Sequence, residues 1–502
     1  MSTVYNDYSR DKIGWFFGLS GPKLALLVVA ASPVLLAIQA HRWTAALASL
    51  GVFAVVAGLS LVRVRGRSSL GWAGATLCFL VASLTGSGRF VAHAAQGAVE
   101  DLGAVDLPGV LAGIEILDGP PQGTSQARPA LILNHAAGTW AATAAVVHPG
   151  IGMAGYEDRR RQGAGLSRLL DLAVRTELID EIILMVRTVP DDGAERAIWV
   201  AQHRTPDAHP LPRRVNTDLG DALTRASVRT EAFVTFVVPE SRIGREARES
   251  GGGIAGRARV LCSLMGEVEA ELRGGLAMTE VRWLSSPELA LATRSGFAPG
   301  DRASVVEALA ARDSDPGVNA DVPWAMAGPS GAEQAVRHYR HDAWHSISET
   351  LTLPSRGAVI GALAPILTPS AAGERRSLMV CYPVLTASRA ERTSDNAEFA
   401  ADMGAELRRV TRVKPRARHR VDAAKAEQMD AKLATGNAMT RPYAVATVTV
   451  PAVMPIAEYG RRLDGAVRRA GFAPMRLDLA QDAGFAAACV PLGISLTRTD
   501  LR

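Results

Sequence analysis

Two long apolar stretches near the start of the chain, residues 24–40 and 44–62, constrain the fold more than any other feature. Neither contains a charged residue, and each is close to the roughly 20 apolar residues that an α-helix needs to cross a membrane. A short polar corner at Gln39, His41 and Arg42 separates them, so the two helices would be antiparallel. We therefore expect a transmembrane helical hairpin over residues 24–64, with a cytoplasmic segment over residues 1–23.

Basic residues beside the hairpin predict its orientation. Arg63, Arg65 and Arg67 follow the second stretch, whereas the corner has one arginine. Because positive residues stay on the cytoplasmic side, these three arginines predict a multi-pass protein of the inner (cytoplasmic) membrane with a cytoplasmic body. A secretory signal peptide is the competing interpretation of the first stretch, but no small-x-small cleavage site follows it.

A third apolar run, residues 70–84, is shorter and contains Gly71, Trp72 and Gly74. We interpret residues 65–100 as an interfacial helix or as a third membrane helix. A third crossing would place the body outside the cell.

Cysteine usage favours a reducing compartment. Cys262, Cys381 and Cys489 lie far apart in apolar contexts, where a free thiol behaves as a small core residue. No Cys-x-x-Cys pair is present, so a structural zinc site is disfavoured.

The remaining chain is long enough for two soluble domains. Residues 311–331 are rich in Pro, Gly, Ser and Asp and predict a linker between a first domain at 101–310 and a second at 332–502. Strand-like runs at 182–186, 233–238, 378–384 and 444–450 alternate with amphipathic helix patterns in both ranges. The predicted fold class is α+β: the hairpin is followed by two mixed, two-layer soluble domains, each with helices on one face of a mostly antiparallel sheet. The repeated order is consistent with a duplication, which one sequence does not establish.

Known catalytic motifs are missing from the sequence. None of the five lysines follows a glycine, which excludes a Gly-x-x-x-x-Gly-Lys-Ser/Thr phosphate loop. Gly-x-Ser-x-Gly and His-Glu-x-x-His are also absent. The glycines at 251–253 are typical of a flexible surface loop. We therefore expect no catalytic residue and no cofactor, and we do not expect the chain to hydrolyse ATP by itself.

One group resembles a metal site in composition: His338, His341, Asp342 and His345. On a helix, His341 and His345 would share a face, as zinc ligands do. The following residues read as extended, however, so a histidine-rich strand or turn is the preferred interpretation, and we expect no metal.

A basic run is the most informative polar feature. It carries seven positive charges and no acidic residue, and it lacks the aromatic side chains that stack on bases. We expect it to contact an anionic surface or a partner protein, and we do not expect direct nucleic-acid binding. Its members are Arg408, Arg409, Arg412, Lys414, Arg416, Arg418 and Arg420.

In this layout the chain resembles an actinobacterial family of membrane proteins associated with conjugative, type IV-like secretion machines. In that family a short membrane hairpin is fused to a body similar to the N-terminal, non-ATPase domain of the secretion ATPase. The resemblance covers nearly the whole chain in order. It rests on Phe17-Gly18-Leu19-Ser20-Gly21-Pro22, residues 63–67 with Gly66, residues 107–117, 187–193, 338–356 around Trp344, and 485–493 ending in Pro491-Leu492-Gly493.

The resemblance implies a membrane-anchored scaffold that binds the lipid bilayer, a separate secretion ATPase and other subunits, and that is oligomeric within the complex. It implies no catalytic residue. Two alternatives stay open: a hairpin-anchored subunit of a type VII-like export complex, and a membrane-bound transferase or hydrolase that uses His341, Asp342 or Glu349.

Overall fold

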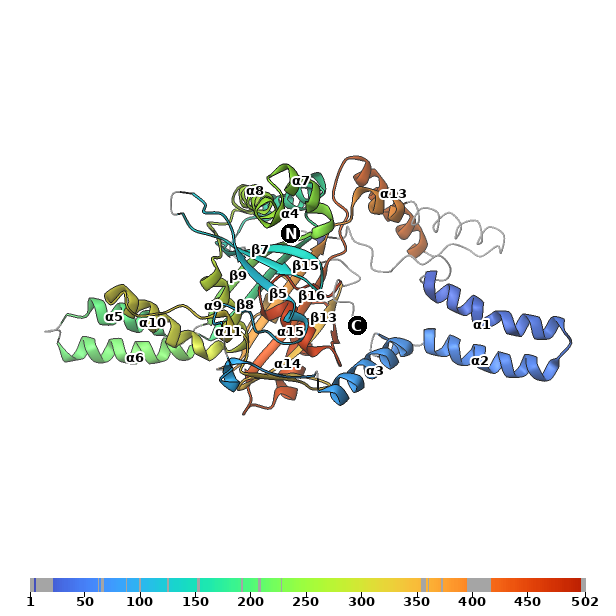
Figure 1. Cartoon of the computed structure of the whole chain (residues 1–502), viewed down its shortest axis with the longest axis horizontal. Helices are drawn as coiled ribbons and strands as arrows, with labels where there is room; N and C mark the ends of the chain where they lie inside the picture. The colour runs from blue at the N-terminus through green and yellow to red at the C-terminus, as the bar shows by residue number, and fades with distance from the viewer. Residues whose placement is uncertain are drawn as a thin grey trace.

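The structure is a computed structural model of the chain (Figure 1). It describes residues 4–5, 21–61, 63–64, 67–86, 88–98, 101–123, 126–150, 154–190, 193–205, 209–226, 228–353, 358–359, 361–371, 373–394 and 417–497.

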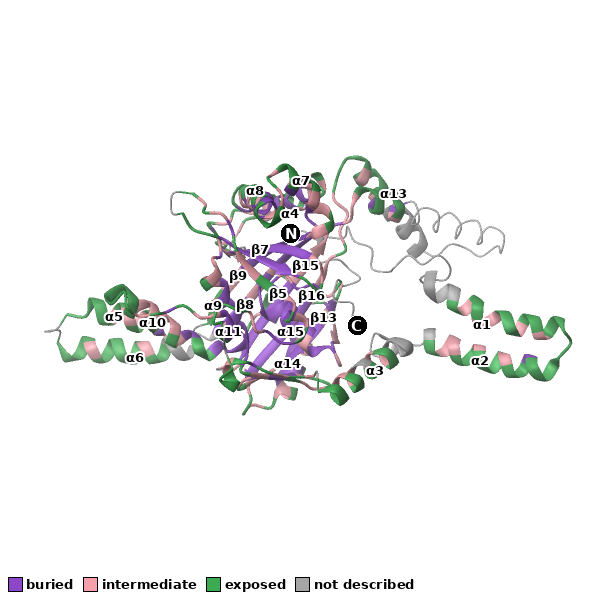
Figure 2. Ribbon diagram, in the orientation of Figure 1, coloured by how far each residue is buried: buried purple, intermediate pink, exposed green. Residues whose placement is uncertain are grey.

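The N-terminal apolar stretches form three helices, α1 (Gly21–Gln39), α2 (Trp43–Leu61) and α3 (Ser69–Thr85). α1 and α2 contact each other as an antiparallel pair that projects from the body (Figure 1). Most of their described side chains are exposed (Figure 2).

The predicted transmembrane hairpin over residues 24–64 is wrong. Within the described residues, no helix combines the length and the apolar character needed to cross a membrane. The same finding contradicts a third membrane helix over 65–100, where the helix α3 has 17 residues. It also contradicts the predicted multi-pass localisation in the inner membrane with a cytoplasmic body.

The body is built on a 13-stranded sheet in which every strand pair among the described residues is antiparallel. The prediction of mixed helix and antiparallel sheet is confirmed. In spatial order the strands are β4 (Arg89–Val91), β11 (Gly331–Gln334), β12 (Tyr339–His341), β13 (Trp344–Thr352), β16 (Tyr443–Pro451), β15 (Arg375–Pro383), β8 (Glu181–Pro190), β9 (Val228–Pro239), β7 (Thr139–Val147), β6 (Ala130–Asn134) and β5 (Ile114–Asp118), with β10 (Glu280–Trp283) beside β7 and β17 (Ala473–Arg476) beside β13.

This order is symmetric about the pair β8·β15. β9 and β16 flank the centre, β7 and β13 follow, and β10 and β17 add to β7 and β13 in the same way. Met185 and Met379 pair with each other at the middle of β8·β15. The chain therefore contains two copies of one strand arrangement related by a pseudo-two-fold axis, a duplication that the sequence did not reveal.

Helices cover both faces of the sheet, rather than the single face that we predicted. One face packs in two clusters, against α4 (Tyr156–Thr176), α7 (Glu240–Glu249) and α8 (Gly253–Gly274) in the first half and against α14 (Ile456–Arg469) and η4 (Ala364–Ile366) in the second. The other face packs in one core that runs across both halves under α9 (Ser286–Phe297), α11 (Trp324–Ala327) and α15 (Gln481–Cys489) (Figures 1 and 2).

The ranges predicted as two domains, 101–310 and 332–502, join through eight residue pairs of β8·β15. The predicted linker, 311–331, contains the end of α10 (Arg302–Ser314) and the whole of α11, which packs into the shared core. The division into two domains stays a prediction, but the strands of both ranges belong to one sheet.

Two fully buried arginines connect the central strands to the ends of α9 and α15. Arg187 of β8 donates from Nη1 to the carbonyl oxygens of Ala292 and Cys489, both at 2.9 Å, and from Nε to Glu231 at 2.6 Å. Arg375 of β15 donates from Nη1 to the carbonyl oxygen of Ser295 at 2.7 Å. Ser295 and Cys489 lie in the last turns of α9 and α15, where carbonyl groups have no partner within the helix, so the guanidinium groups satisfy these two carbonyls where water does not reach.

Gly296 allows the two helix ends to approach each other. A Cβ atom at this position would lie 2.7 Å from the carbonyl oxygen of Cys489 and 3.2 Å from Nη1 of Arg187. We predict that Gly296→Ala lowers the free energy of unfolding by about 1–3 kcal/mol, because the backbone of α15 must shift away from its arginine donor.

Gly266→Ala in α8 is the matched control for this prediction, measured by chemical denaturation. Its Cβ would meet no atom within 4 Å, so the helix should gain about 0.5–1 kcal/mol. Equal effects of the two substitutions would show that the helix ends do not need the close approach.

Candidate functional site

The histidine group adopts a strand–turn–strand arrangement rather than a helix. His341 ends β12, and both of its ring nitrogens have partners: Nδ1 lies 2.8 Å from the carbonyl oxygen of Phe297, and Nε2 lies 2.8 Å from Oγ of Ser346. Since a carbonyl oxygen can only accept, Nδ1 carries the hydrogen and Nε2 accepts from the serine hydroxyl. Burial, together with the charge of Arg375, holds the pKa of His341 well below its ordinary value, so the ring is neutral.

The chain of hydrogen bonds continues into the core. Oγ of Ser346 lies 2.7 Å from Oγ1 of Thr449, which accepts from Nη2 of Arg375 at 3.2 Å. A serine donating to a histidine is the arrangement that activates a nucleophile in hydrolases. Here Ser346, Thr449 and Arg375 are fully buried, and the histidine is oriented by a backbone carbonyl instead of a carboxylate. The group therefore acts as a structural network between β12, β13, β15 and β16.

The structure does not bring together the three residues named for the enzyme alternative. Asp342 accepts from Nη1 of Arg294 at 3.0 Å and from the amide of Ser330 at 2.6 Å, which fixes the β12–β13 turn. Glu349 lies among the residues under α14, on the face of β13 opposite to Ser346, because alternate strand residues point to opposite faces. Within the described residues, no group of three or more His, Cys, Asp or Glu side chains could hold a metal ion.

Glu349 is nevertheless an unusual residue. Neither of its carboxylate oxygens receives a hydrogen bond from the described residues, although the side chain is fully buried. Burial, and after it the neighbouring Asp464, raises the pKa of Glu349 to about 9. A protonated Glu349 can donate to Asp464, which is itself held by Nη2 of Arg476 at 2.9 Å.

The other predicted residues lie on or beyond the margin of the described chain. Arg63 and Arg67 lie in a short ribbon of β2 (Arg63–Val64) and β3 (Arg67–Ser68), and Arg65 lies outside the described residues. Their orienting role depended on the membrane hairpin corrected above. In the basic run, Arg418 and Arg420 belong to α13 (Ala417–Ala434), and the remaining members, Arg408, Arg409, Arg412, Lys414 and Arg416, lie outside the described residues. Gly251, Gly252 and Gly253 have positive φ angles at the start of α8.

Several exposed apolar side chains of the body lie on a helical arm that projects on the side opposite to α1 and α2 (Figure 1). We define this arm as α5 (Ala194–His203), α6 (Pro210–Ala226) and α10. Glu195 fixes α5 to the sheet, because it accepts from Arg302 at 2.7 Å and from Arg229 at 2.5 Å. Arg302 is itself buried.

Apolar side chains of the arm face solvent on two helices. A groove of about 340 Å³ lies between α5 and α10, lined by Ile198, Trp199, Val306, Leu309 and Ala310, and Trp199 is 60% exposed. On α6, Leu211, Val215 and Leu219 follow one another at intervals of four residues, and each is at least half exposed. Residues at this spacing share one face of a helix. Sequence reasoning missed this feature, although the same spacing could have been found in residues 210–226.

The arm also has a counterpart in the duplicated fold. α5 and α6 are inserted between β8 and β9, and the segment that contains α13 and the predicted basic run is inserted between the equivalent strands β15 and β16. Each half thus carries a long insertion at the same position in its strand order.

Comparison with known proteins adds no further assignment: no family model matches this chain, and no curated protein matches it.

The raised pKa of Glu349 predicts how stability depends on pH. The folded protein keeps a proton on this residue between about pH 4.5 and 9 that the unfolded chain releases, so stability is lost as pH rises through this window, by up to ~1.4 kcal/mol per unit. Glu349→Gln, whose amide can still donate to Asp464, should raise the midpoint of thermal unfolding at pH 8 and flatten its dependence on pH. Glu249→Gln on exposed α7 is the control and should leave the profile unchanged; a Glu349→Gln profile parallel to the wild type would contradict the assignment.

Proposed function

We propose that this chain is a non-catalytic scaffold component of a type IV-like conjugation or secretion apparatus, and that its helical arm docks a separate ATPase. The observation that carries the proposal is the exposed apolar surface of the arm. In a single folded body, side chains such as Trp199, Leu211 and Val215 are stabilised when a partner covers them. The resemblance to the secretion family supports the choice of apparatus.

The shape of the arm favours one kind of contact. The groove between α5 and α10 has an apolar floor, with Glu195, Arg312 and Asp313 at its margins. An amphipathic helix would fit this groove. Its apolar stripe would lie against the apolar residues of the groove, and its polar residues would lie beside the charged residues of both signs. We therefore expect the ATPase to contribute a helix of this type.

The arrangement of polar groups in the core is consistent with a binding role. Ser346 and His341 are fully buried and hydrogen-bonded to each other, and Glu349 lies on the other face of the sheet. An enzymatic function would need these groups to face a substrate together.

A triple substitution on the arm tests the proposal. Trp199→Asp in the groove, with Leu211→Asp and Val215→Asp on α6, should together abolish copurification of the ATPase from the native host, identified by mass spectrometry through its Gly-x-x-x-x-Gly-Lys-Ser/Thr loop. The side chains are exposed, so the far-ultraviolet circular dichroism and the unfolding midpoint should stay within the wild-type range.

Val453→Asp is the matched control, because Val453 is 93% exposed and lies after β16, away from the arm. It should retain the ATPase. Recovery of the same ATPase with the triple variant, or recovery of type VII export subunits with the wild type, would contradict the proposal.

A further inference from the structure

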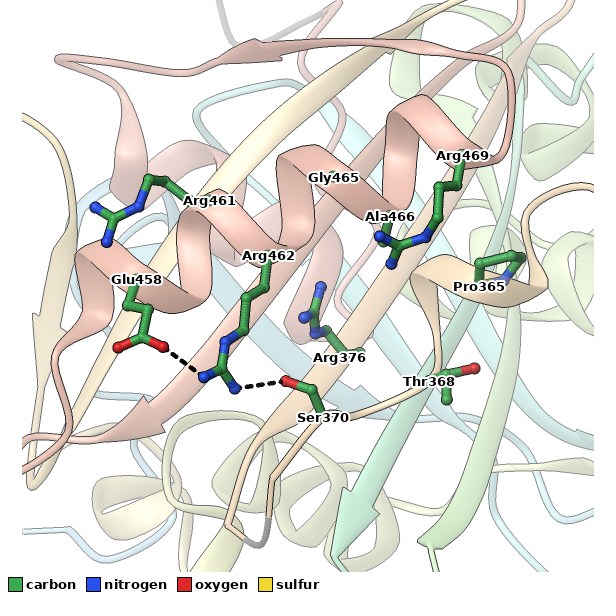
Figure 3. Close-up of a pocket in the computed structure, with 10 residues that line it drawn as sticks. All are labelled: Pro365, Thr368, Ser370, Arg376, Glu458, Arg461, Arg462, Gly465, Ala466 and Arg469. Carbon is green, nitrogen blue, oxygen red and sulfur yellow. Dashed lines mark hydrogen bonds and ion pairs between the residues drawn. The ribbon is translucent and has the colours of Figure 1, made fainter.

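A pocket lined by arginines lies between α14 and the segment around η4, on the face of the sheet that also packs Glu349 (Figure 3). Its volume is about 360 Å³, at the lower end of the range of small-molecule sites. Arg461, Arg462 and Arg469 reach it from α14, and Arg376 reaches it from β15.

Arg376 forms the floor of this pocket. Its side chain is 2% exposed; its Nε donates to Glu374, and its Nη1 has no hydrogen-bond partner among the described residues. Leaving a buried guanidinium donor unpaired is unfavourable, so an acceptor inside the pocket would stabilise the fold.

The walls add positive charge that the protein does not neutralise. Within the described part of the chain, Arg461 and Arg469 form no ion pair, whereas Arg462 pairs with Glu458 and donates from Nη1 to Oγ of Ser370 at 3.1 Å (Figure 3). Four arginines thus face two carboxylates, those of Glu458 and Glu374. A folded protein tolerates an excess of like charge in one hollow when a counter-ion occupies it.

The remaining acidic neighbour contributes little negative charge. Burial, and then Asp464, raises the pKa of Glu349 to about 9, so this carboxyl group is neutral at pH 7. Asp464 is already paired with Arg476. Neither Glu349 nor Asp464 therefore neutralises the positive charge of the pocket.

We propose that this pocket binds the phosphate group of a small phosphorylated molecule. Guanidinium groups present parallel N–H donors that match the oxygens of a phosphate, which is why arginine clusters recognise this group. Arg376, Arg462 and Arg469 hold the phosphate, and the part of the cavity beside Pro365, Thr368 and Ala466 receives the rest of the molecule. The volume suits a phosphomonoester. The site is separate from the arm, and its test does not depend on the proposed docking of an ATPase.

Isothermal titration of the full chain tests the site with three probes: inorganic phosphate, glycerol 3-phosphate, and sodium chloride at matched ionic strength. The wild type should bind at least one of the two phosphate probes, and chloride should have no effect. Tighter binding of glycerol 3-phosphate than of inorganic phosphate identifies an organic phosphomonoester as the ligand, and the reverse order identifies free phosphate. Absence of binding of both phosphates at 10 mM, on the order of the weakest useful affinity, would overturn the proposal.

Arg462→Ala with Arg469→Ala removes two exposed donors of the pocket and should weaken binding at least tenfold. Arg245→Ala with Arg468→Ala removes the same charge from exposed positions outside the pocket, one of them on α14 itself, and should change binding less than twofold. Equal losses in the two double variants would show a general charge effect and would refute the site.

The pH dependence gives a second readout. The second ionisation of a phosphomonoester lies near pH 6, whereas arginine stays charged. Affinity for glycerol 3-phosphate should therefore fall as pH decreases from about 7 to 5, and affinity that rises on acidification would contradict contact with the arginines.

Discussion

The fold depends on the buried contact between the guanidinium groups of Arg187 and Arg375 and the carbonyl ends of α9 and α15. Removing two arginines from water costs several kcal/mol each, and hydrogen bonds to acceptors of good geometry offset this cost. Glu231, Ser295, Thr449 and the backbone oxygens of Ala292 and Cys489 accept from the two guanidinium groups, whereas Nε of Arg375 has no partner among the described residues. Because each arginine comes from a central strand and each carbonyl from a helix of one half, the contact fixes both helices and both halves of the sheet at once.

The duplication gives this contact its form. Two equivalent helices, α9 and α15, approach the pseudo-two-fold axis with their C-terminal ends, and the like partial charges of these ends would repel each other without cations between them. Gly296 provides the space for the approach. The same symmetry places two long insertions at equivalent positions in the strand order, with α5 and α6 between β8 and β9 and the segment that contains α13 between β15 and β16.

The sequence predicts the individual helices and strands of this fold well. It does not predict the features that depend on contacts between residues far apart in the chain. The strand-like runs locate β8, β9, β15 and β16 to within a few residues, because the apolar pattern records which residues are buried. The placement of Cys381 and Cys489 in apolar contexts is confirmed by their complete burial.

The pairing of β8 with β15 joins residues almost 200 positions apart, and no local pattern encodes it. The membrane hairpin was wrong, since no helix among the described residues is both long and apolar enough to cross a membrane. The same holds for the site residues. The sequence shows His341 as part of a histidine-rich segment. It does not show that the ring is neutral or that both ring nitrogens form hydrogen bonds, because these properties depend on Phe297 and Ser346. The arginine pocket combines residues of β15, η4 and α14, whose proximity follows only from the sheet.

The contact of Arg187 with Cys489, across 302 residues, also has a consequence for biogenesis. A ribosome releases the first copy of the strand arrangement well before β15 and α15 are made, so the edge of β8 that pairs with β15 stays open until residues 375–383 have emerged. Exposed strand edges of this kind associate with other chains. The carbonyl acceptor that Cys489 offers to Arg187 comes later still, when α15 is made.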